Sequence, residues 1–264
     1  MMVNLKDKYQ HFHPEEYSFI DKVSEIINRV EDTYVINITD FLNPRQIDIL
    51  KSLVAPTKLQ TFSSNDYYGT EYGRVIIAPA YYQFDQNDFE LDLLEINYNA
   101  KFNQLRHSQI LGTLINELGI KRESMGDILV EEGYGQLMIS HHLLNYFLGN
   151  ISKIGRASVT LKKIPINQLI KEANEMTSTD ILVSSLRIDL IMASVIKMSR
   201  SQAMKFIESE KVKVNYRKVT RTSDNLALGD MISVRGYGRF KIESDNGLSK
   251  NGKIKLTISK TMRK

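Results

Sequence analysis

The pattern of apolar and polar positions predicts a small α/β domain in the first 80 residues. An amphipathic helix is indicated between Pro14 and Val30, because apolar residues recur there at helical spacing: Tyr17, Ile20, Val23, Ile26, Ile27 and Val30. A second helix is predicted to start at Asn43 and Pro44, since asparagine caps helices and proline suits their first turn. Strands are predicted for two β-rich runs, Tyr34 to Ile38 and Arg74 to Ala78.

The following region shows the order of elements βαββαβ. The pattern predicts helices and strands with these bounds: strand Leu91 to Tyr98, helix Ser108 to Leu118, strands Asp127 to Glu131 and Gly135 to Ser140, helix His142 to Leu148 and strand Ala157 to Lys162. Ferredoxin-like and RNA-recognition folds share this split βαβ order. RNA-recognition domains stack bases on aromatic side chains of central strands, but the third predicted strand offers only the preceding Tyr134. The role of this central domain therefore stays open.

The polar stretch Glu172 to Asp180 is interpreted as a linker, and the net charge changes sign across it. Residues 1–182 hold 17 Lys and Arg against 24 Asp and Glu, a net charge of −7, whereas residues 183–264 hold 18 against 7, a net charge of +11. A basic part of this kind suits a polyanionic partner. A solvated basic surface without a partner is the alternative, and charge alone does not separate RNA from DNA or an anionic membrane.

Composition narrows the class of protein. With 264 residues, of which 42% are hydrophobic and 25% charged, the chain is typical of a soluble globular protein of two or three domains. It contains no cysteine, which excludes disulfides, zinc sites built on cysteine and thiol nucleophiles, and which favours the cytoplasm. Because no apolar run has the length of a signal peptide or a membrane span, we expect a cytoplasmic protein with no membrane partner.

The basic part begins with the pattern of two short helices. In the first helix we expect Arg187 and Asp189 on the outer face, while four apolar residues pack inward: Leu186, Leu190, Ile191 and Val195. Ser199 is suited to cap the second helix, whose apolar face would be Ala203, Phe206 and Ile207. A helix N-terminus offers free N–H groups and the positive end of a dipole, so Arg200 and Ser201 beside it suit a phosphate.

Strands are predicted after these helices. Lys211 to Asn215 alternates basic or polar residues with valines, which predicts a strand with one buried and one cationic face. Gly229 and Asp230 form a turn into a second strand, Met231 to Arg235. The basic tail is expected to add two more strands and to extend the basic surface, with a disordered tail as the alternative; the strands would be Lys241 to Ser244 and Lys253 to Ser259.

This succession of elements closely resembles the S-four RNA-binding domain, named after small-subunit ribosomal protein four. The resemblance implies binding to structured RNA, with helix ends and a strand against the phosphate backbone. Many such domains have glycine where this chain has Glu210 and Tyr216, so the turns beside the strand are expected to differ in geometry. Carried over by position, the expected RNA contacts are Arg187, Ser199, Arg200, Ser201, Gln202, Lys205, Lys211, Lys213, Asn215 and Arg235.

Three upstream segments extend the resemblance: HSQILG from His107, GIKR from Gly119 and GDIL from Gly126. They are similar to the central domain of the bacterial YlmH family, in which an α/β region and an RNA-recognition-like domain precede a terminal S-four domain. The family often has Arg-Asp after the histidine, where this chain has Ser108 and Gln109. The resemblance implies an α+β fold with an N-terminal domain at 1–80, an RNA-recognition-like domain at 81–176, an S-four domain at 182–240 and a basic extension at 241–264.

The family resemblance also implies a role in translation. It implies binding of rRNA or tRNA on a large ribosomal subunit that carries a stalled peptidyl-tRNA, in support of ribosome-associated quality control. The family is linked to cell division by genomic neighbourhood, so an interaction protein of cell division is an alternative. In that case the basic surface would bind an acidic protein or membrane lipid, which predicts a basic amphipathic helix. The positive charge here lies instead on a hairpin and at a helix start.

An RNA-modifying enzyme is the main competing interpretation, because S-four modules also occur on pseudouridine synthases, methyltransferases and tRNA synthetases. The sequence has no glycine-rich phosphate loop after a strand. Its five histidines, including the adjacent His141 and His142, lack the spacing of a metalloprotease and are interpreted as surface or packing residues. Asp127 fits the turn at a strand start at least as well as a catalytic role. We therefore expect no catalytic residue, no metal, no cofactor and no small-molecule substrate.

Overall fold

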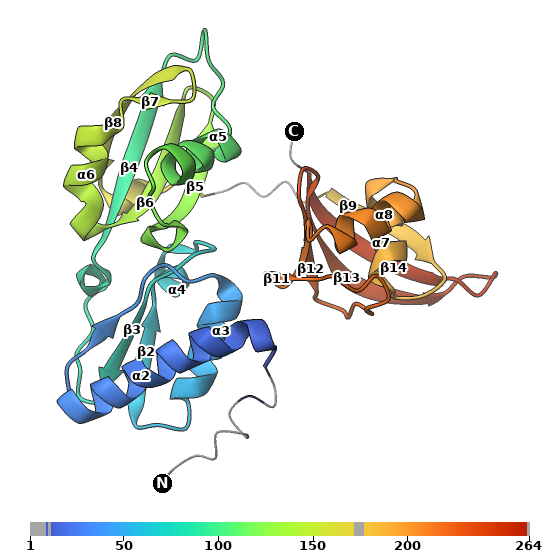
Figure 1. Cartoon of the computed structure of the whole chain (residues 1–264), viewed down its shortest axis with the longest axis horizontal. Coiled ribbons are helices and arrows are strands. Elements are labelled where there is room, and N and C mark those ends of the chain that lie inside the picture. Colours follow the sequence, from blue (N-terminus) through green and yellow to red (C-terminus); the bar gives the residue numbers. More distant parts are fainter. Residues whose placement is uncertain (1–8, 10–11, 172–176, 263–264) are drawn as a thin grey trace. The chain divides into compact units, whose positions relative to one another are not determined.

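The computed structural model describes residues 9, 12–171 and 177–262, with the side chain of residue 262 excepted (Figure 1). They form two compact units, Met1–Glu172 (unit 1) and Ala173–Lys264 (unit 2). The chain has the α+β architecture that the sequence predicts. None of the described helices combines the length and the apolar character needed to cross a membrane.

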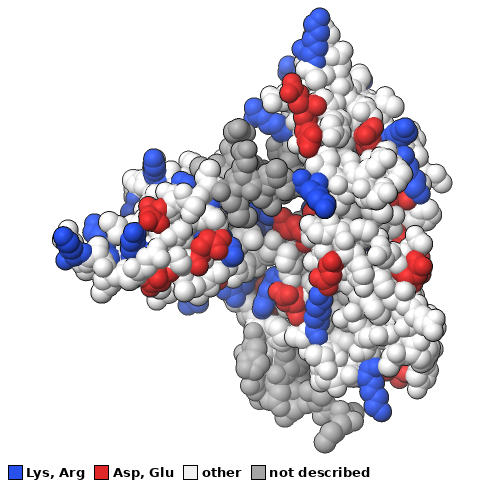
Figure 2. All heavy atoms as spheres, turned by 180° about the vertical axis from the view of Figure 1, so that it is seen from behind, with Lys and Arg blue, Asp and Glu red and all other residues white. Residues whose placement is uncertain are grey.

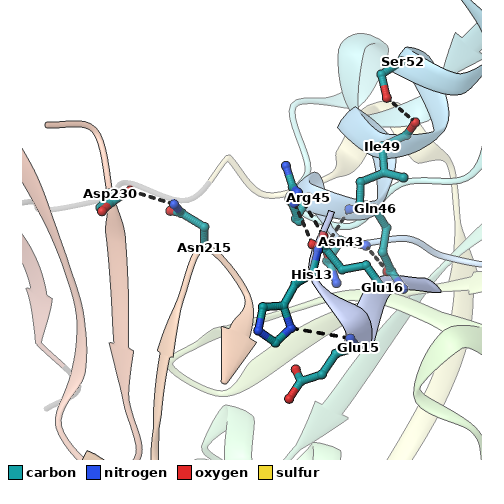
Figure 3. A network of polar contacts seen from close by, with 10 residues as sticks. All are labelled: His13, Glu15, Glu16, Asn43, Arg45, Gln46, Ile49, Ser52, Asn215 and Asp230. Carbon is teal, nitrogen blue, oxygen red and sulfur yellow. Dashed lines mark hydrogen bonds and ion pairs between the residues drawn. The ribbon is translucent and has the colours of Figure 1, made fainter. Parts of the chain in front are cut away.

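The first part of unit 1 is a three-stranded antiparallel sheet of order β1-β3-β2, with α2 and α3 packed against it. Its elements in chain order are η1 (Pro14–Glu16), α2 (Tyr17–Thr33), β1 (Asn37–Ile38), α3 (Pro44–Val54), β2 (Leu59–Ser63), α4 (Ser64–Tyr68) and β3 (Val75–Pro79). Both predicted helices are confirmed. Asn43 and Gln46 cap α3 reciprocally, each side chain accepting from the other's backbone N–H at 3.0 Å (Figure 3). Arg45 in the same turn donates two hydrogen bonds to Glu16.

The predicted strand Tyr34 to Ile38 is shorter in the structure. Tyr34 ends α2 with a left-handed backbone (φ 58°), so strand pairing begins only at Asn37. The sequence pattern also missed β2 and α4, whose residues do not alternate regularly between buried and exposed positions.

The second part of unit 1 confirms the predicted βαββαβ order. Its sheet has the order β5-β6-β4-β8-β7, and α5 and α6 lie on one face of it (Figure 1). The elements are η2 (Gln86–Phe89), β4 (Leu91–Tyr98), α5 (His107–Gly112), η3 (Thr113–Glu117), η4 (Arg122–Ser124), β5 (Met125–Glu131), β6 (Tyr134–Ser140), η5 (His141–Leu143), α6 (Leu144–Asn150), β7 (Lys153–Ile154), β8 (Ala157–Ile164) and η6 (Ile166–Gln168). The predicted helix Ser108 to Leu118 is divided, because regular α-helix gives way to a π-helical turn after Gly112.

The other face of this sheet is partly covered by the chain itself. Gln136 projects from β6 on the side opposite Leu137, which packs in the helix-covered core. The Gln136 amide is 3% exposed; it donates to the carbonyl of Gln168 at 2.9 Å and accepts from the N–H of Ile170 at 2.7 Å. Residues 165–171 therefore lie against β6, through Gln168 and Ile170, on the face that RNA-recognition domains leave open.

Buried polar contacts join the two sheets of unit 1. The Asp127 carboxylate accepts hydrogen bonds from the backbone N–H groups of Glu71 and Tyr72 at 2.7 and 2.9 Å, and burial raises the pKa of this carboxyl group. Arg74 is 6% exposed and donates to the carbonyls of Thr39, Phe89 and Glu90 at 2.8 to 3.0 Å; burial lowers its pKa. Asp127 is thus a structural residue of this junction.

Unit 2 is a six-stranded antiparallel sheet of order β11-β10-β12-β13-β14-β9, with α7 and α8 packed on one face. Its elements are β9 (Thr177–Val183), α7 (Ile188–Ile196), α8 (Arg200–Glu208), β10 (Val212–Val214), β11 (Arg217–Lys218), β12 (Met231–Val234), β13 (Gly238–Leu248) and β14 (Ile254–Met262). The core combines aliphatic residues from both helices with the inward residues of the strands, such as Ile191, Ile207, Val212, Ile232 and Ile258.

Two sequence-based expectations about unit 2 need correction. The interpretation of Glu172 to Asp180 as a linker is wrong for Thr177 to Asp180, which pair with β14 as part of β9; residues 172–176 lie outside the described residues. The alternative of a disordered tail is also wrong up to residue 262, since β13 contains the first predicted tail strand and β14 contains all of the second except Lys253. The predicted domain boundary at residue 240 falls inside β13.

Replacement of Gly126 by alanine should destabilise unit 1. An added Cβ would lie 2.6 Å from Cε1 of Phe41, a residue of the first sheet region, so the junction would have to shift. We expect a loss of about 1 to 3 kcal/mol in the free energy of unfolding, measured by chemical denaturation. Gly149→Ala in α6 is the control, because nothing lies within 4 Å of its added Cβ. Equal stability of the two variants would contradict the close contact at Phe41.

Candidate nucleic-acid interface

The N-terminus of α8 is organised by its own side chains. Ser199 Oγ accepts from the N–H of Gln202 at 3.2 Å, and Gln202 Oε1 accepts from the N–H of Ser199 at 3.1 Å. The predicted cap at Ser199 is therefore confirmed. Ser201 Oγ lies 3.0 Å from Ser199 Oγ, so these two hydroxyls also bond to each other. Ser199 and Gln202 chiefly hold the helix start in shape.

Asp189 differs from the sequence-based expectation. We expected it on the outer face of the first helix, but its side chain is completely buried. Its two oxygens accept hydrogen bonds from Nε and Nη2 of Arg187, both at 3.1 Å, and from Nε of Arg200 at 2.7 Å. Burial raises the pKa of Asp189, but the hydrogen bonds from the two arginines outweigh it, so the pKa is lowered. The carboxylate stays ionised inside the domain because two cations share it.

The shared carboxylate fixes two guanidinium groups side by side. Arg187 precedes α7 and Arg200 opens α8, and their side chains remain 34% and 50% exposed. A guanidinium has five N–H donors, so each arginine keeps donors that Asp189 does not use. Arginines held in this way can bind a phosphate with little loss of side-chain freedom.

The predicted cationic strand is confirmed. Val212 and Val214 are buried in β10, whereas Lys211, Lys213 and Asn215 are exposed on the other face of the sheet from α7 and α8. The backbone N–H of Arg235 donates to the carbonyl of Lys211 at 2.9 Å, which makes these two residues neighbours across the sheet. Among the described residues, no acidic side chain forms an ion pair with Lys211, Lys213 or Arg235.

Asn215 has a structural contact of its own. Its side chain donates to Asp230 at 2.8 Å and accepts from the N–H of Met231 at 2.9 Å, which ties the end of β10 to the Gly229 turn (Figure 3). Its φ of 48° and that of Tyr216, 69°, are left-handed. Glu210 before the strand is also left-handed, with a φ of 55°. The positive φ values of Glu210 and Tyr216 explain why similar domains have glycine at these two positions, since glycine has no Cβ to oppose a positive φ.

The ten expected RNA contacts divide into two sets. The helix group, on the side of α7 and α8, consists of Arg187, Ser199, Arg200, Ser201, Gln202 and Lys205. The sheet group, on the opposite face, consists of Lys211, Lys213, Asn215 and Arg235. Lys211 lies where they approach each other, with Nζ 5.3 Å from the centroid of the Phe206 ring of α8. The structure thus does not bring all ten residues onto one surface.

Sequence reasoning missed cations beside the sheet group. Lys218 lies opposite Lys213, Arg239 opposite Ser233 and Lys241 opposite Met231, so all three share the face of the sheet group. Alternation along β13 could have revealed two of them. Figure 2 shows acidic side chains among the cations of unit 2. Several lysines are indeed ion-paired with acidic residues, in the pairs Lys218–Glu210, Lys241–Glu243 and Lys255–Asp180.

The central domain offers less to a nucleic acid. The Tyr134 hydroxyl donates to Glu131 at 3.0 Å, and this hydrogen bond raises the pKa of the phenol. Next to it on the same face, Gln136 is covered by residues 165–171. The geometry therefore gives no support to base stacking on this sheet.

A polar cluster at the start of β4 was not foreseen. Asp92 is 4% exposed and contacts His141 Nδ1 at 2.7 Å and Lys163 Nζ at 2.6 Å, one through each oxygen. A shallow hollow of about 280 Å³ lies beside it, lined also by Tyr68 and Glu90. Both carboxylate oxygens are occupied, so Asp92 links the start of β4 to η5 through His141 and to β8 through Lys163. No group of three or more His, Asp or Glu in the described part of the chain is placed to hold a metal ion.

Comparison with protein families assigns all three regions. Residues 15–82 match the model "YlmH, N-terminal", residues 85–168 match "Putative RNA-binding domain in YlmH", and residues 186–232 match the S4 domain.

Individual relatives agree with these matches. The chain is 34% identical over 256 residues to the Bacillus subtilis (strain 168) protein named "Ribosome-associated protein quality control protein P2", covering 97% of this chain and 99% of that one. A solved structure named "Cell division protein ylmH from Streptococcus pneumoniae" is 44% identical with a TM-score of 0.55, and the match covers 62% of this chain and 99% of that one.

Replacing Asp189 with asparagine should lower the stability of unit 2 and release Arg187 and Arg200 from their fixed positions. The neutral amide cannot compensate two guanidinium groups, so we expect roughly 2 to 3 kcal/mol of destabilisation, less than for a fully buried pair because both arginines are partly exposed. Hydrogen exchange of amides in β10 and β12 would report this loss. Unchanged protection in the variant would show that the carboxylate does not organise the domain.

The same carboxylate predicts a dependence on pH. Because the pKa of Asp189 is lower in the folded protein than in the unfolded chain, its contribution to stability is present above about pH 4 and is lost as the pH falls through the folded-state pKa. The difference in unfolding free energy between the native protein and Asp189→Asn should therefore shrink on acidification below about pH 4. A difference that stays constant down to pH 2, measured by urea denaturation, would count against an ionised Asp189.

Proposed function

Because the chain belongs to the YlmH family, we propose that it binds structured RNA of the ribosome through unit 2 and takes part in ribosome-associated quality control. The RNA would be rRNA, tRNA or both, on a large subunit that carries a stalled peptidyl-tRNA. In this proposal the protein is a non-catalytic binding factor, as the resemblance of the sequence implies.

The observation that supports this proposal best is the pair of arginines held by Asp189. Both keep donors free beside the N-terminus of α8, where unpaired backbone N–H groups and the helix dipole favour an anion. Lys205 lies one turn further along α8, exposed and without an ion pair among the described residues. Arg187, Arg200 and Lys205 carry three positive charges against the one negative charge of Asp189, so a phosphate backbone would meet an excess of positive charge there.

The domain organisation is consistent with different roles for unit 1 and unit 2. We propose that residues 1–80 and 81–176 position the RNA-binding domain, and that the S-four domain proper, 182–240, acts together with the extension 241–264. The net charge of −7 over residues 1–182 supports this assignment, because an acidic region repels RNA. Strands of the S-four domain and of the extension belong to one continuous sheet in unit 2, which supports joint action of these two parts.

A role in cell division is the second candidate, favoured by the name of the Streptococcus pneumoniae structure. An accessory part of an RNA-modifying enzyme is a further alternative, but the polar cluster at Asp92 gives it little support because both carboxylate oxygens are occupied. Sucrose-gradient sedimentation of cell extracts, with sequencing of crosslinked RNA, separates these functions. Co-sedimentation with large subunits supports the proposal, and absence from all ribosomal fractions would favour cell division.

Binding to purified large ribosomal subunits should weaken as salt increases. If phosphates are neutralised by unit 2, the logarithm of the association constant falls linearly with the logarithm of salt concentration, by roughly 0.7 to 0.9 per phosphate. Pelleting assays between about 50 and 200 mM salt measure this slope. Binding that does not respond to salt would contradict an interface built on these cations.

Variants of each cationic set should bind the large subunit more weakly. We expect Arg200→Ala with Lys205→Ala, and separately Lys211→Ala with Lys213→Ala, to cost up to a few kcal/mol of binding free energy and to lower the salt slope by about 1 to 2. The control is Lys22→Ala with Lys51→Ala, which removes two charges from unit 1. Normal binding by both variants would show that neither the helix group nor the sheet group contacts RNA.

A further inference from the structure

The hairpin of β13 and β14 continues beyond the S-four region. The family match ends at residue 232, and β12 pairs with β13 only as far as Lys241. From Glu243 to Leu248, β13 continues beside β14 for about 17 Å at roughly 3.3 Å per residue. The hairpin projects from the sheet in Figure 1, and its tip is formed by residues 249–253.

Side-chain contacts stiffen this hairpin across three strands. Asn246 donates to Thr257 Oγ1 at 2.7 Å, and Thr257 donates to Asp180 of β9 at 2.8 Å. The tip is closed by the N–H of Ser249, which donates to the carbonyl of Lys253 at 2.7 Å, and by the N–H of Lys253, which donates to Ser249 Oγ at 3.0 Å. The tip residues are therefore presented in one ordered turn.

The charge of the hairpin increases toward its tip. From Asn246 to Lys264 the sequence contains no Asp or Glu. Lys250 and Lys253 are exposed, and neither forms an ion pair with an acidic residue of the described chain. The acidic residues lie nearer the base and have other contacts: Glu243 with Lys241 and Ser259, and Asp245 with the N–H of Gly247. In Figure 2 the same projecting end carries Lys or Arg side chains.

We infer that the tip of this hairpin, through Lys250 and Lys253, binds the phosphate backbone of an RNA segment other than the one that meets the helix group. The ordered turn holds two ammonium groups without competing carboxylates, and lysine binds phosphate as a mobile point charge. The inference rests on the proposed function, because it assumes that unit 2 docks on RNA. It adds a contact in a part of the chain that the S4 match does not include.

The test compares two double variants on purified large ribosomal subunits. Lys250→Ala with Lys253→Ala removes the two unpaired lysines of the tip. The control, Lys51→Ala with Lys255→Ala, removes the same charge from one lysine of unit 1 and one of the hairpin, which are already paired with Asp66 and Asp180. Pelleting assays give the association constant and its salt slope, and hydroxyl-radical footprinting of the rRNA shows which nucleotides each variant protects.

We expect the tip variant to bind roughly fivefold to tenfold more weakly, with a salt slope lower by about 1.4 to 1.8, and to lose protection of one rRNA segment while keeping that of the helix group. The control variant should bind nearly as the native protein does. Equal behaviour of the two variants would overturn the inference, whereas weakened binding by the helix-group variant would still uphold the proposed function. If the native protein did not bind large subunits at all, both would fail.

Discussion

The RNA-binding unit depends on one buried carboxylate. Asp189 lies at the start of α7 with no exposed surface, and it receives hydrogen bonds from the residue before α7 and from the first residue of α8. A lone charge in this position would be very unfavourable, so the ion pair both requires and maintains the close approach of the two helices. The same contact orients the arginines that face solvent. Stability and recognition in this unit therefore share a single group.

The sequence predicted the elements whose local signals are strong. Strict alternation marked β10, and the capping preference of Ser199 marked the start of α8, because both signals involve only neighbours in the chain. Asp189 was misplaced because its charge suggests an outer position, whereas its partner Arg200 lies eleven residues away. The polar residues of β9 resembled a linker for a similar reason. They face solvent, and the strand is specified by pairing with β14, about eighty residues later.

The motif residues of the central domain owe their roles to tertiary structure. Gly126 and Asp127 stand out in the sequence, and the structure shows that the glycine admits the ring of Phe41 while the carboxylate binds two backbone amides of the first domain region. No spacing rule could have predicted this, since the partners are more than fifty residues apart. The covered sheet face is equally nonlocal, because it depends on Gln136 meeting residues 165–171.

The pairing of β9 with β14 affects how the protein is made. The first strand of unit 2, β9, pairs with the last described strand, β14. The sheet is therefore complete only after the residues up to 262 have been synthesised. Unit 1 has no such requirement and can fold while the rest of the chain is still being translated. A nascent chain interrupted before β14 would therefore carry a folded acidic half and an unfinished basic one.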